Sequence, residues 1–584
     1  MSTYDDASLI YYPSGYKESK AYSLKPTDGS GDLTFTRAST ATRVNEQGLI
    51  EGVRTNLLTY SEQFDNAAWV KNNSSVTANV TTAPNGTTTA DKLIPNATAS
   101  VNKYIRQVPS ATNGLIYSLT VFAKAAEYDM LRIEDGNNSR GAWFNLSLGT
   151  VGSVSLDVST NIEALENGWY KCTISKLSAA SSVFFLIGGS NTESVQVGDG
   201  TSGIYIWGAM LEQSVQATEY IPTTTTAVSV GMLANVPRID YTGGGCGKLL
   251  LEPQRTNLIK NSANVGAGFV VGNITLVLNN AAAPNGLVEA DKFYPTTSGG
   301  NRWFYQAVTT SASSTISVFA KAAGKDILYI SQGGGTDVSF NLSSGLVTYE
   351  SSGWVGSIED FGDGWYRCIA VRSSSVSFAA YGVADSSGGS FVTASGTDGI
   401  LVWGMQCEQG SYSTSLINTS GVAVTRVADK ATKSAISSLI GQTEGTIFLD
   451  FIFKTPKNPI AGQIAITAIG GVNNRVVIWN NSTLNTIAVT IQANGATIFN
   501  TSLGSFIDGQ QYKIAIGYKS GDNIAYVNGT QVFSNSIAFA FGLTLTDFIL
   551  GGYEAAQEPH QRTQSVIIFP TRLSNAELAT LTTI

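Results

Sequence analysis

Residues 168–172 of this sequence read Gly-Trp-Tyr-Lys-Cys, and residues 364–368 read Gly-Trp-Tyr-Arg-Cys. Both stretches belong to a longer internal repeat. Val121-Phe122-Ala123-Lys124-Ala125-Ala126 recurs at 318–323, Phe144-Asn145-Leu146-Ser147 recurs at 340–343, and Arg54-Thr55-Asn56-Leu57 recurs at 255–258. Matches that keep nearly the same spacing indicate a duplicated domain of about 200 residues, which is too long for a solenoid unit.

Each copy is expected to consist of β-strands. Residues 117–123 and 169–174 alternate in polarity and are rich in β-branched and aromatic side chains, as strands are. Pro-Asn-Gly turns at 84–86 and 284–286 separate such runs, and no window of a dozen residues has a helical period. The pattern predicts over 40% strand and under 10% helix, in tandem antiparallel β-sandwich or jelly-roll domains.

The composition excludes several classes of function. Of 584 residues only 13% are charged, about half the average of about 25%, and the net charge is −8. This argues against nucleic acid as a partner. One histidine excludes multi-histidine metal centres, and four scattered cysteines exclude a disulfide scaffold. No apolar run reaches the roughly 18 residues of a membrane helix, and the polar start lacks a signal peptide. We therefore expect neither membrane insertion nor Sec-type export.

Four segments follow from these patterns. Residues 1–34 crowd five tyrosines into a stretch without strand periodicity, and we expect a short irregular segment that attaches to a partner. Residues 35–225 and 226–428 are the two jelly-roll repeats. Residues 429–584 are not a third copy; they contain the hairpin signal Asn528-Gly529 and end in a short predicted helix with Ser574 as N-cap.

Several motifs resemble those of bacteriophage virion fibre and appendage proteins. They are Thr36-Arg37-Ala38-Ser39-Thr40-Ala41-Thr42-Arg43-Val44, Arg54-Thr55-Asn56-Leu57-Leu58 and Leu250-Leu251-Glu252-Pro253-Gln254-Arg255-Thr256-Asn257-Leu258. The repeats are similar to carbohydrate-binding-module jelly rolls, and residues 429–584 resemble a concanavalin-A-like, laminin-G-type sandwich. One departure is that Tyr220-Ile221-Pro222-Thr223 becomes Leu416-Ile417-Asn418-Thr419 in the second copy, so the second exit segment is expected to take another path.

The resemblance implies a structural virion protein, a head or tail fibre subunit assembled in the host cytoplasm. It further implies a homotrimer that is attached to capsid or tail proteins through residues 1–30, with the 429–584 sandwich pointing outward and host-surface glycans as ligands. A dedicated carbohydrate-binding receptor-recognition adhesin is the alternative, and a polysaccharide depolymerase is a third. We predict no enzyme, because the Glu-x-Asp-x-x-Glu strand that concanavalin-like glucanases carry is absent.

Tryptophans are the main candidate site residues. Four occupy equal places in both copies, which favours a structural core role: Trp169, Trp365, Trp207 and Trp403. Trp143 and Trp354 each occur in one copy only, and we predict that these two rings contact a glycan.

No catalytic residue, metal ligand or cofactor is predicted. Asp91 and Asp291 follow Asn-Gly turns in both copies and are interpreted as turn or strand-end hydrogen-bond acceptors, with a structural calcium ion as the alternative. Cys246 lies in a predicted glycine-rich loop, and His560 is predicted to lie in a surface loop.

Overall fold

The computed structural model describes residues 3–98, 102–193, 198–300, 302–333, 337–453, 461–468, 471–481, 486–505, 507, 509–551 and 560–584. Strands hold 53% of the residues and helices 3%, which confirms the predicted all-β class. The chain divides into two compact units. One unit contains residues 53–231 with 287–289, and the other contains residues 1–52, 232–286 and 290–584.

Repeat 1, in the smaller unit, is a sandwich of two six-stranded antiparallel sheets. The first sheet has the order β14 (Thr150–Val154), β13 (Arg140–Asn145), β12 (Met130–Asp135), β17 (Phe185–Ser190), β10 (Tyr104–Gln107) and β7 (Val70–Asn72). The second sheet has the order β15 (Val158–Ala164), β16 (Trp169–Leu177), β11 (Ile116–Ala125), β18 (Ile204–Glu212), β9 (Ala90–Pro95) and β8 (Ser74–Thr81). A 3-10 turn, Glu166–Gly168, leads into β16.

Repeat 2 has the same two-sheet topology. Its first sheet has the order β30 (Leu346–Glu350), β29 (Val338–Asn341), β28 (Ile327–Ser331), β33 (Phe378–Ala384), β26 (Trp303–Ala307) and β23 (Val270–Gly272). Its second sheet has the order β31 (Trp354–Asp360), β32 (Trp365–Arg372), β27 (Ser314–Ala323), β34 (Gly399–Gln409), β25 (Val288–Pro295) and β24 (Ile274–Ala282). Strand for strand, the duplication seen in the sequence is a duplication of fold.

The repeated Arg-Thr-Asn-Leu motif forms the neck of each sandwich. β6 (Val53–Asn56) pairs with β19 (Val228–Gly231), and β22 (Arg255–Asn257) pairs with β35 (Val424–Arg426), so each repeat begins and ends in one two-stranded ribbon. Buried Asn257 donates to the carbonyls of Met405 and Ile417, and its Oδ1 accepts from the amides of Ile259 and Cys407.

Asn56 makes the equivalent four bonds in repeat 1, including one to the carbonyl of Ile221. Thr223 and Thr419 also make matching bonds with Ser61 and Ser262. The expectation that the second exit segment takes another path is therefore wrong. Ile417 takes the place of Ile221, and the asparagine of each neck bonds only to the backbone carbonyl of this isoleucine.

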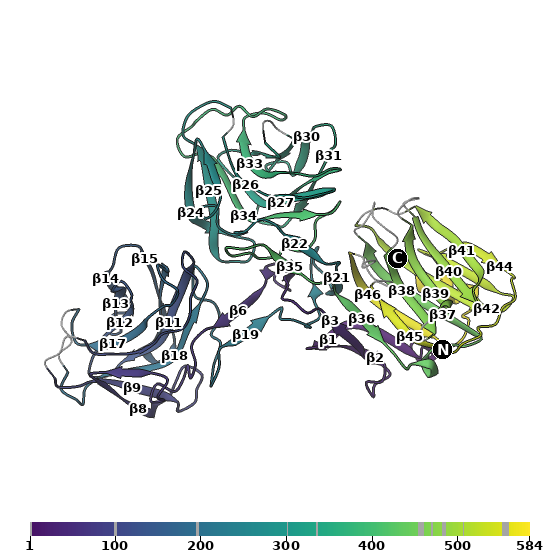
Figure 1. Ribbon diagram of the computed structural model, residues 1–584. Coiled ribbons are helices and arrows are strands. Elements are labelled where there is room, and N and C mark those ends of the chain that lie inside the picture. The colour runs from purple at the N-terminus through teal and green to yellow at the C-terminus, as the bar shows by residue number, and fades with distance from the viewer. Residues whose placement is uncertain are drawn as a thin grey trace. The chain divides into compact units, whose positions relative to one another are not determined.

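The remaining sandwich, called the basal sandwich below, is built from distant parts of the chain. One continuous path of hydrogen-bonded strands contains β41 (Ala496–Ser505), β40 (Thr486–Ala493), β39 (Gly471–Asn481), β38 (Ala461–Ala468), β45 (Leu545–Leu550), β36 (Lys430–Lys433), β3 (Leu33–Thr36), β2 (Lys20–Lys25), β1 (Leu9–Lys17), β46 (Gln561–Phe569), β37 (Glu444–Phe453), β42 (Gln511–Lys519), β43 (Asn523–Val527) and β44 (Thr530–Asn535). β21 (Lys248–Leu251) also pairs with β46, and with β20 (Ile239–Asp240). Purple β1–β3 lie beside β36 and yellow β46 in Figure 1.

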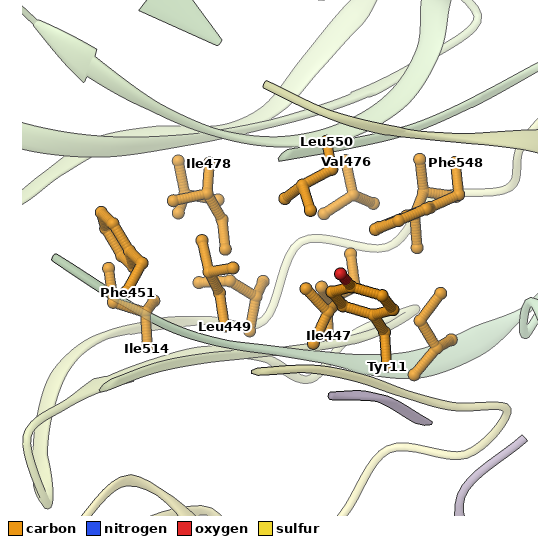
Figure 2. Close-up of a cluster of buried hydrophobic side chains, with 14 of the residues drawn as sticks. Tyr11, Ile447, Leu449, Phe451, Val476, Ile478, Ile514, Phe548 and Leu550 are labelled. Carbon is orange, nitrogen blue, oxygen red and sulfur yellow. The ribbon is translucent and has the colours of Figure 1, made fainter. Parts of the chain in front are cut away.

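Residues 9–36 therefore form strands of the basal sandwich, so the prediction that residues 1–34 are irregular is wrong, whereas their attachment to a partner stays a prediction. Leu9 and Tyr11 point into the main core of the basal sandwich, whereas Ile10 points into a smaller apolar cluster on the other face of the same sheet. Figure 2 shows the Tyr11 ring among Ile447, Leu449 and Val476, with its oxygen directed toward the opposite layer. Where a central strand is buried on both faces, its sequence shows no alternation of polar and apolar residues.

Both repeats are thus insertions into the basal sandwich. The chain leaves this sandwich after β3, returns for β20 and β21, leaves again, and returns for β36. Residues 35–52, which the sequence placed in repeat 1, belong to the larger unit; they include the short hairpin of β4 (Arg43–Val44) and β5 (Ile50–Glu51).

A buried ion cluster ties these crossings together. Arg238 pairs with Glu252 at 2.7 Å and also with Asp429, which pairs with Arg37 at 3.0 Å; Arg426 lies 2.8 Å from Glu252. All five side chains are fully buried. The arginines hold the pKa of the Glu252 carboxyl well below its usual value despite its burial. The sequence motifs at 36–44 and 250–258 supply two of these charges, Arg37 and Glu252.

His560 lies against the same cluster, with Nε2 3.3 Å from Glu252 Oε1, and it is buried. The prediction of a surface loop for this residue is wrong. The predicted terminal helix is confirmed as α2 (Asn575–Thr582), with a capping box between Ser574 and Glu577. The other helical segments among the described residues are short: α1 (Thr3–Asp6) and the 3-10 turns Glu166–Gly168 and Ser437–Leu439.

Candidate functional site

Three aromatic side chains gather on the outer face of one sheet of repeat 2. β26 alternates, so Phe304 enters the core whereas Trp303 and Tyr305 point away from it. Phe378 begins β33, the neighbouring strand, and is 37% exposed. Trp303 and Tyr305 are half-buried. We call Trp303, Tyr305 and Phe378 the aromatic trio.

Edge-to-face packing holds the trio together. The ring centroids of Trp303 and Tyr305 are 4.6 Å apart at 61°, and those of Tyr305 and Phe378 are 5.3 Å apart at 81°. Such pairs are among the favourable aromatic geometries and fix the rings relative to one another. The result is a preformed, partly exposed apolar platform on a rigid sheet.

A glycine continues this face beside Trp303. Gly382 lies opposite Trp303 on one side and opposite Tyr329 on the other. A Cβ at position 382 would lie 2.1 Å from the Tyr329 ring, so only glycine lets that ring lie across the strand. Tyr329 is 1% exposed, its hydroxyl has no hydrogen-bond partner among the described residues, and burial raises its pKa.

Repeat 1 carries a changed version of the trio. Tyr104 and Arg106 occupy in β10 the places that Trp303 and Tyr305 occupy in β26, because Ile105 and Phe304 are the core residues between them. Phe184, next to Phe185 at the start of β17, corresponds to Phe378. The Arg106 guanidinium lies over the Phe184 ring at 5.2 Å.

The two predicted glycan contacts have different outcomes. Trp354 belongs to the core of repeat 2 and is 5% exposed, with Arg372 over its ring at 5.6 Å, so the prediction for this residue is wrong. Trp143 does lie on the outer face of its sheet, directly opposite Arg132. The guanidinium covers the ring at 5.5 Å and leaves Trp143 7% exposed, so its contact with a glycan stays a prediction.

The four repeated tryptophans are buried and equivalently placed. Trp169 lies opposite Lys124 and Trp365 lies opposite Lys321; Trp207 packs against Phe122, and Trp403 packs against Phe319. Their exposures range from 1% to 5%. No ring among them offers a free face to a sugar.

The paired aspartates organise loops. Asp91 accepts the amides of Phe64 and Asn79, each at 2.9 Å, and Asp291 accepts those of Val265 and Asn279. Burial raises the pKa of Asp91 to about 6. Among the described residues, no three His, Cys, Asp or Glu side chains lie close enough to share a metal ion.

The remaining candidate groups lie apart from the trio. Asp135 pairs with Lys176 at 2.7 Å, whereas its neighbour Glu134 pairs with Arg132. Cys172, Cys368 and Cys407 are buried, and burial raises the pKa of each thiol; Cys246 is exposed. In the part of the chain that the structure describes, no helix has the length and apolarity needed to cross a bilayer.

The sequence did contain a signal for the trio. Trp303-Phe304-Tyr305-Gln306 places two large rings on one face of a strand and a core phenylalanine on the other. A tryptophan without an aromatic counterpart is too narrow a signal to find it, because Trp303 is matched by Tyr104 in repeat 1 and Tyr305, which is matched by Arg106, is not a tryptophan.

Comparisons with known proteins give partial matches only. No model of a protein family matches the chain, and no curated protein matches it. The CBM40 of Ruminococcus gnavus IT-sialidase, bound to α2,3-sialyllactose, is 14% identical with a TM-score of 0.23, covering 26% of this chain and 91% of that one. Domain 4 of the Geobacillus stearothermophilus arabinanase AbnA, with arabinotriose, is 11% identical with a TM-score of 0.23, covering 26% and 73%. The receptor-binding domain of botulinum neurotoxin D is 14% identical with a TM-score of 0.21, covering 26% and 40%.

Proposed function

We propose that this chain is an adhesion protein that binds glycans through its repeats, and that the aromatic trio of repeat 2 is a saccharide platform. One observation carries the proposal: three large rings stand partly exposed on a sheet face whose core is already complete. Exposed aromatic clusters of this kind are typical of binding surfaces rather than of folding.

The chemistry of sugars suits this platform. A pyranose ring presents a C–H face that is apolar and a rim of hydroxyls that is polar. The C–H face stacks on an aromatic ring, and the rim stays hydrated or contacts polar side chains. Trp303 and Phe378 flank Tyr305 and offer such ring surface without a carboxylate among the three. An uncharged saccharide is therefore the expected ligand of repeat 2.

Binding of the full chain to an array of neutral and acidic glycans tests this proposal. Trp303→Ala should weaken binding of the neutral ligands at least tenfold and leave the thermal unfolding midpoint nearly unchanged. Tyr349→Ala is the matched control, because Tyr349 is 39% exposed on β30 of the same sheet, four strands from β26 and about 19 Å away. Equal effects of both variants, or none of either, would overturn the assignment of the site.

For the whole protein we propose a virion appendage, a homotrimeric head or tail fibre subunit. The motifs at 36–44 and 250–258, which resemble those of phage appendages, support it; so does the insertion of both repeats into one basal sandwich, which suits display of binding modules. Because residues 9–36 complete that sandwich, the particle contact is assigned to the basal sandwich rather than to a free segment. Antibody labelling of intact particles in electron micrographs, together with mass photometry of the purified chain, tests location and copy number.

Two alternatives make different predictions. A dedicated receptor-recognition adhesin would bind cells as the isolated chain and would be missing from purified particles. A polysaccharide depolymerase would release reducing ends from a glycan that it binds, which a colorimetric assay detects.

A further inference from the structure

The two repeats form a matched pair in which one side chain has changed character. Tyr305 lies opposite Ala380 and Val270 in repeat 2, and Arg106 lies opposite Leu186 and Val70 in repeat 1. The strands occupy the same place in sheets of the same order. A cation thus replaces the central ring of the trio, while aromatic residues remain on both sides of it.

Arg106 differs from three other basic residues of repeat 1. Lys92, Arg132 and Lys176 each pair with a carboxylate. Arg106 forms no ion pair with a described carboxylate, its Nε is buried without a hydrogen-bond partner, and its guanidinium stacks on Phe184 at 5.2 Å. A half-buried guanidinium without an anion retains strong donors for one.

We propose that repeat 1 binds an anionic saccharide whose carboxylate or sulfate lies against Arg106, whereas repeat 2 binds an uncharged one. The inference rests on the proposed glycan-binding function and assigns a ligand class to its second module. Tyr104 and Phe184 supply the ring surface for the sugar, and the planar guanidinium supplies paired donors that match the geometry of an oxyanion. Stacking on Phe184 holds the guanidinium plane in place.

The proposal explains why the two faces diverged while the necks did not. Asn56 and Asn257 make the same four hydrogen bonds, so the scaffold is kept. The change falls on the outer face, where it leaves the core untouched. One chain then carries two specificities.

Reciprocal exchange tests the inference. Arg106→Tyr copies into repeat 1 the residue that repeat 2 holds at that place, and Tyr305→Arg does the reverse, so each variant has a precedent in its own fold. The full chain and both variants are applied to an array of uronic-acid, sulfated and neutral oligosaccharides. Arg106→Tyr should weaken binding of acidic ligands at least tenfold and spare neutral ones. Tyr305→Arg should weaken binding of neutral ligands by a similar factor.

Further comparisons distinguish a carboxylate ligand from a sulfate ligand, and the effect of the paired arginine donors from that of the charge alone. Methyl-esterified oligogalacturonate against free oligogalacturonate distinguishes a carboxylate ligand from a sulfate one, and Arg106→Lys keeps the charge but loses the paired donors. Acidic binding that survives Arg106→Tyr, or an array with neutral hits only, overturns the inference and leaves the proposed function standing. An array with no hits at all overturns both. Unfolding midpoints within error of the parent exclude misfolding as the cause.

Discussion

Tyr11 offers a direct test of the discontinuous basal sandwich. Its side chain is fully buried in the same core as Ile447, Leu449 and Val476, although more than 400 residues separate it from them in the sequence. If residues 9–17 were a free segment that only attaches to a partner, replacing Tyr11 would leave the isolated chain as stable as before. In this structure Tyr11→Ala opens a cavity in the core.

The loss of unfolding free energy in Tyr11→Ala follows from the burial of the Tyr11 ring. Removing a fully buried aromatic side chain costs about 3–5 kcal/mol, a large part of the roughly 5–15 kcal/mol that stabilises a domain. Tyr11→Phe is the matched control, since the hydroxyl has no hydrogen-bond partner among the described residues and burial raises its pKa. We expect this variant to be as stable as the parent or about 1 kcal/mol more stable, because an unsatisfied buried hydroxyl is removed.

Hydrogen exchange followed by mass spectrometry measures the effect locally. In Tyr11→Ala, peptides from β46 and β37 should lose two to three powers of ten in protection, the equivalent of about 3–4 kcal/mol. Peptides from β11 of repeat 1 serve as the internal control and should be unchanged. Unaltered protection of β46 in Tyr11→Ala would refute the pairing of β1 with β46.

Three further predictions concern the buried asparagines of the two necks, the carboxyl group of Asp91 and the cysteine thiols. Asn257→Ala leaves buried backbone groups unpaired and should lower the unfolding free energy of repeat 2 by about 3–5 kcal/mol in calorimetry, with Asn56→Ala doing the same in repeat 1 and neither affecting the other repeat. Burial holds the pKa of Asp91 at about 6, above its ordinary 3.8, so the folded protein binds this proton more tightly than the unfolded chain does. The stability that Asp91 contributes is therefore lost as the pH rises from about 4 to 6. In Asp91→Asn, the unfolding midpoint should fall less steeply with pH across this range. A thiol reagent should label Cys246 alone in the native chain and four cysteines after denaturation, and rapid labelling of a second native thiol would contradict the burial of the other three.

The sequence predicted the duplication and the strands because both depend on local patterns. Alternation in β11 and β16 marks one buried face, and the Asn-Gly turn and the capping box of α2 are set by neighbours in the chain. The role of Asn56 was not predictable in this way. Its four bonds go to backbone groups up to 165 residues away, and no local pattern encodes them.

The N-terminal strands were missed for a related reason. Leu9-Ile10-Tyr11 is a continuous apolar run because both faces of β1 are covered, one by the main core and the other by the cluster around Phe448. The crowding of tyrosines suggested an interface, and the partner turned out to be the other end of the same chain. Similarly, Trp354 is unique to repeat 2 because that core is filled differently, with Val158 in the matching strand of repeat 1.

The pairing of β1 with β46 also sets an order of events during synthesis. Ser8 bonds to the carbonyl of Ile568, 560 residues further along the chain. Each repeat can close its own neck ribbon as soon as its last strand emerges, so both can fold while the chain is still being made. Strand β1 can pair with β2 early, but its other edge must wait until residues 561–569 leave the ribosome, and two folded repeats meanwhile separate it from β46. A ribosome stalled before residue 561 would therefore hold two folded repeats and an incomplete basal sandwich, in which the edge of β1 that pairs with β46 stays open.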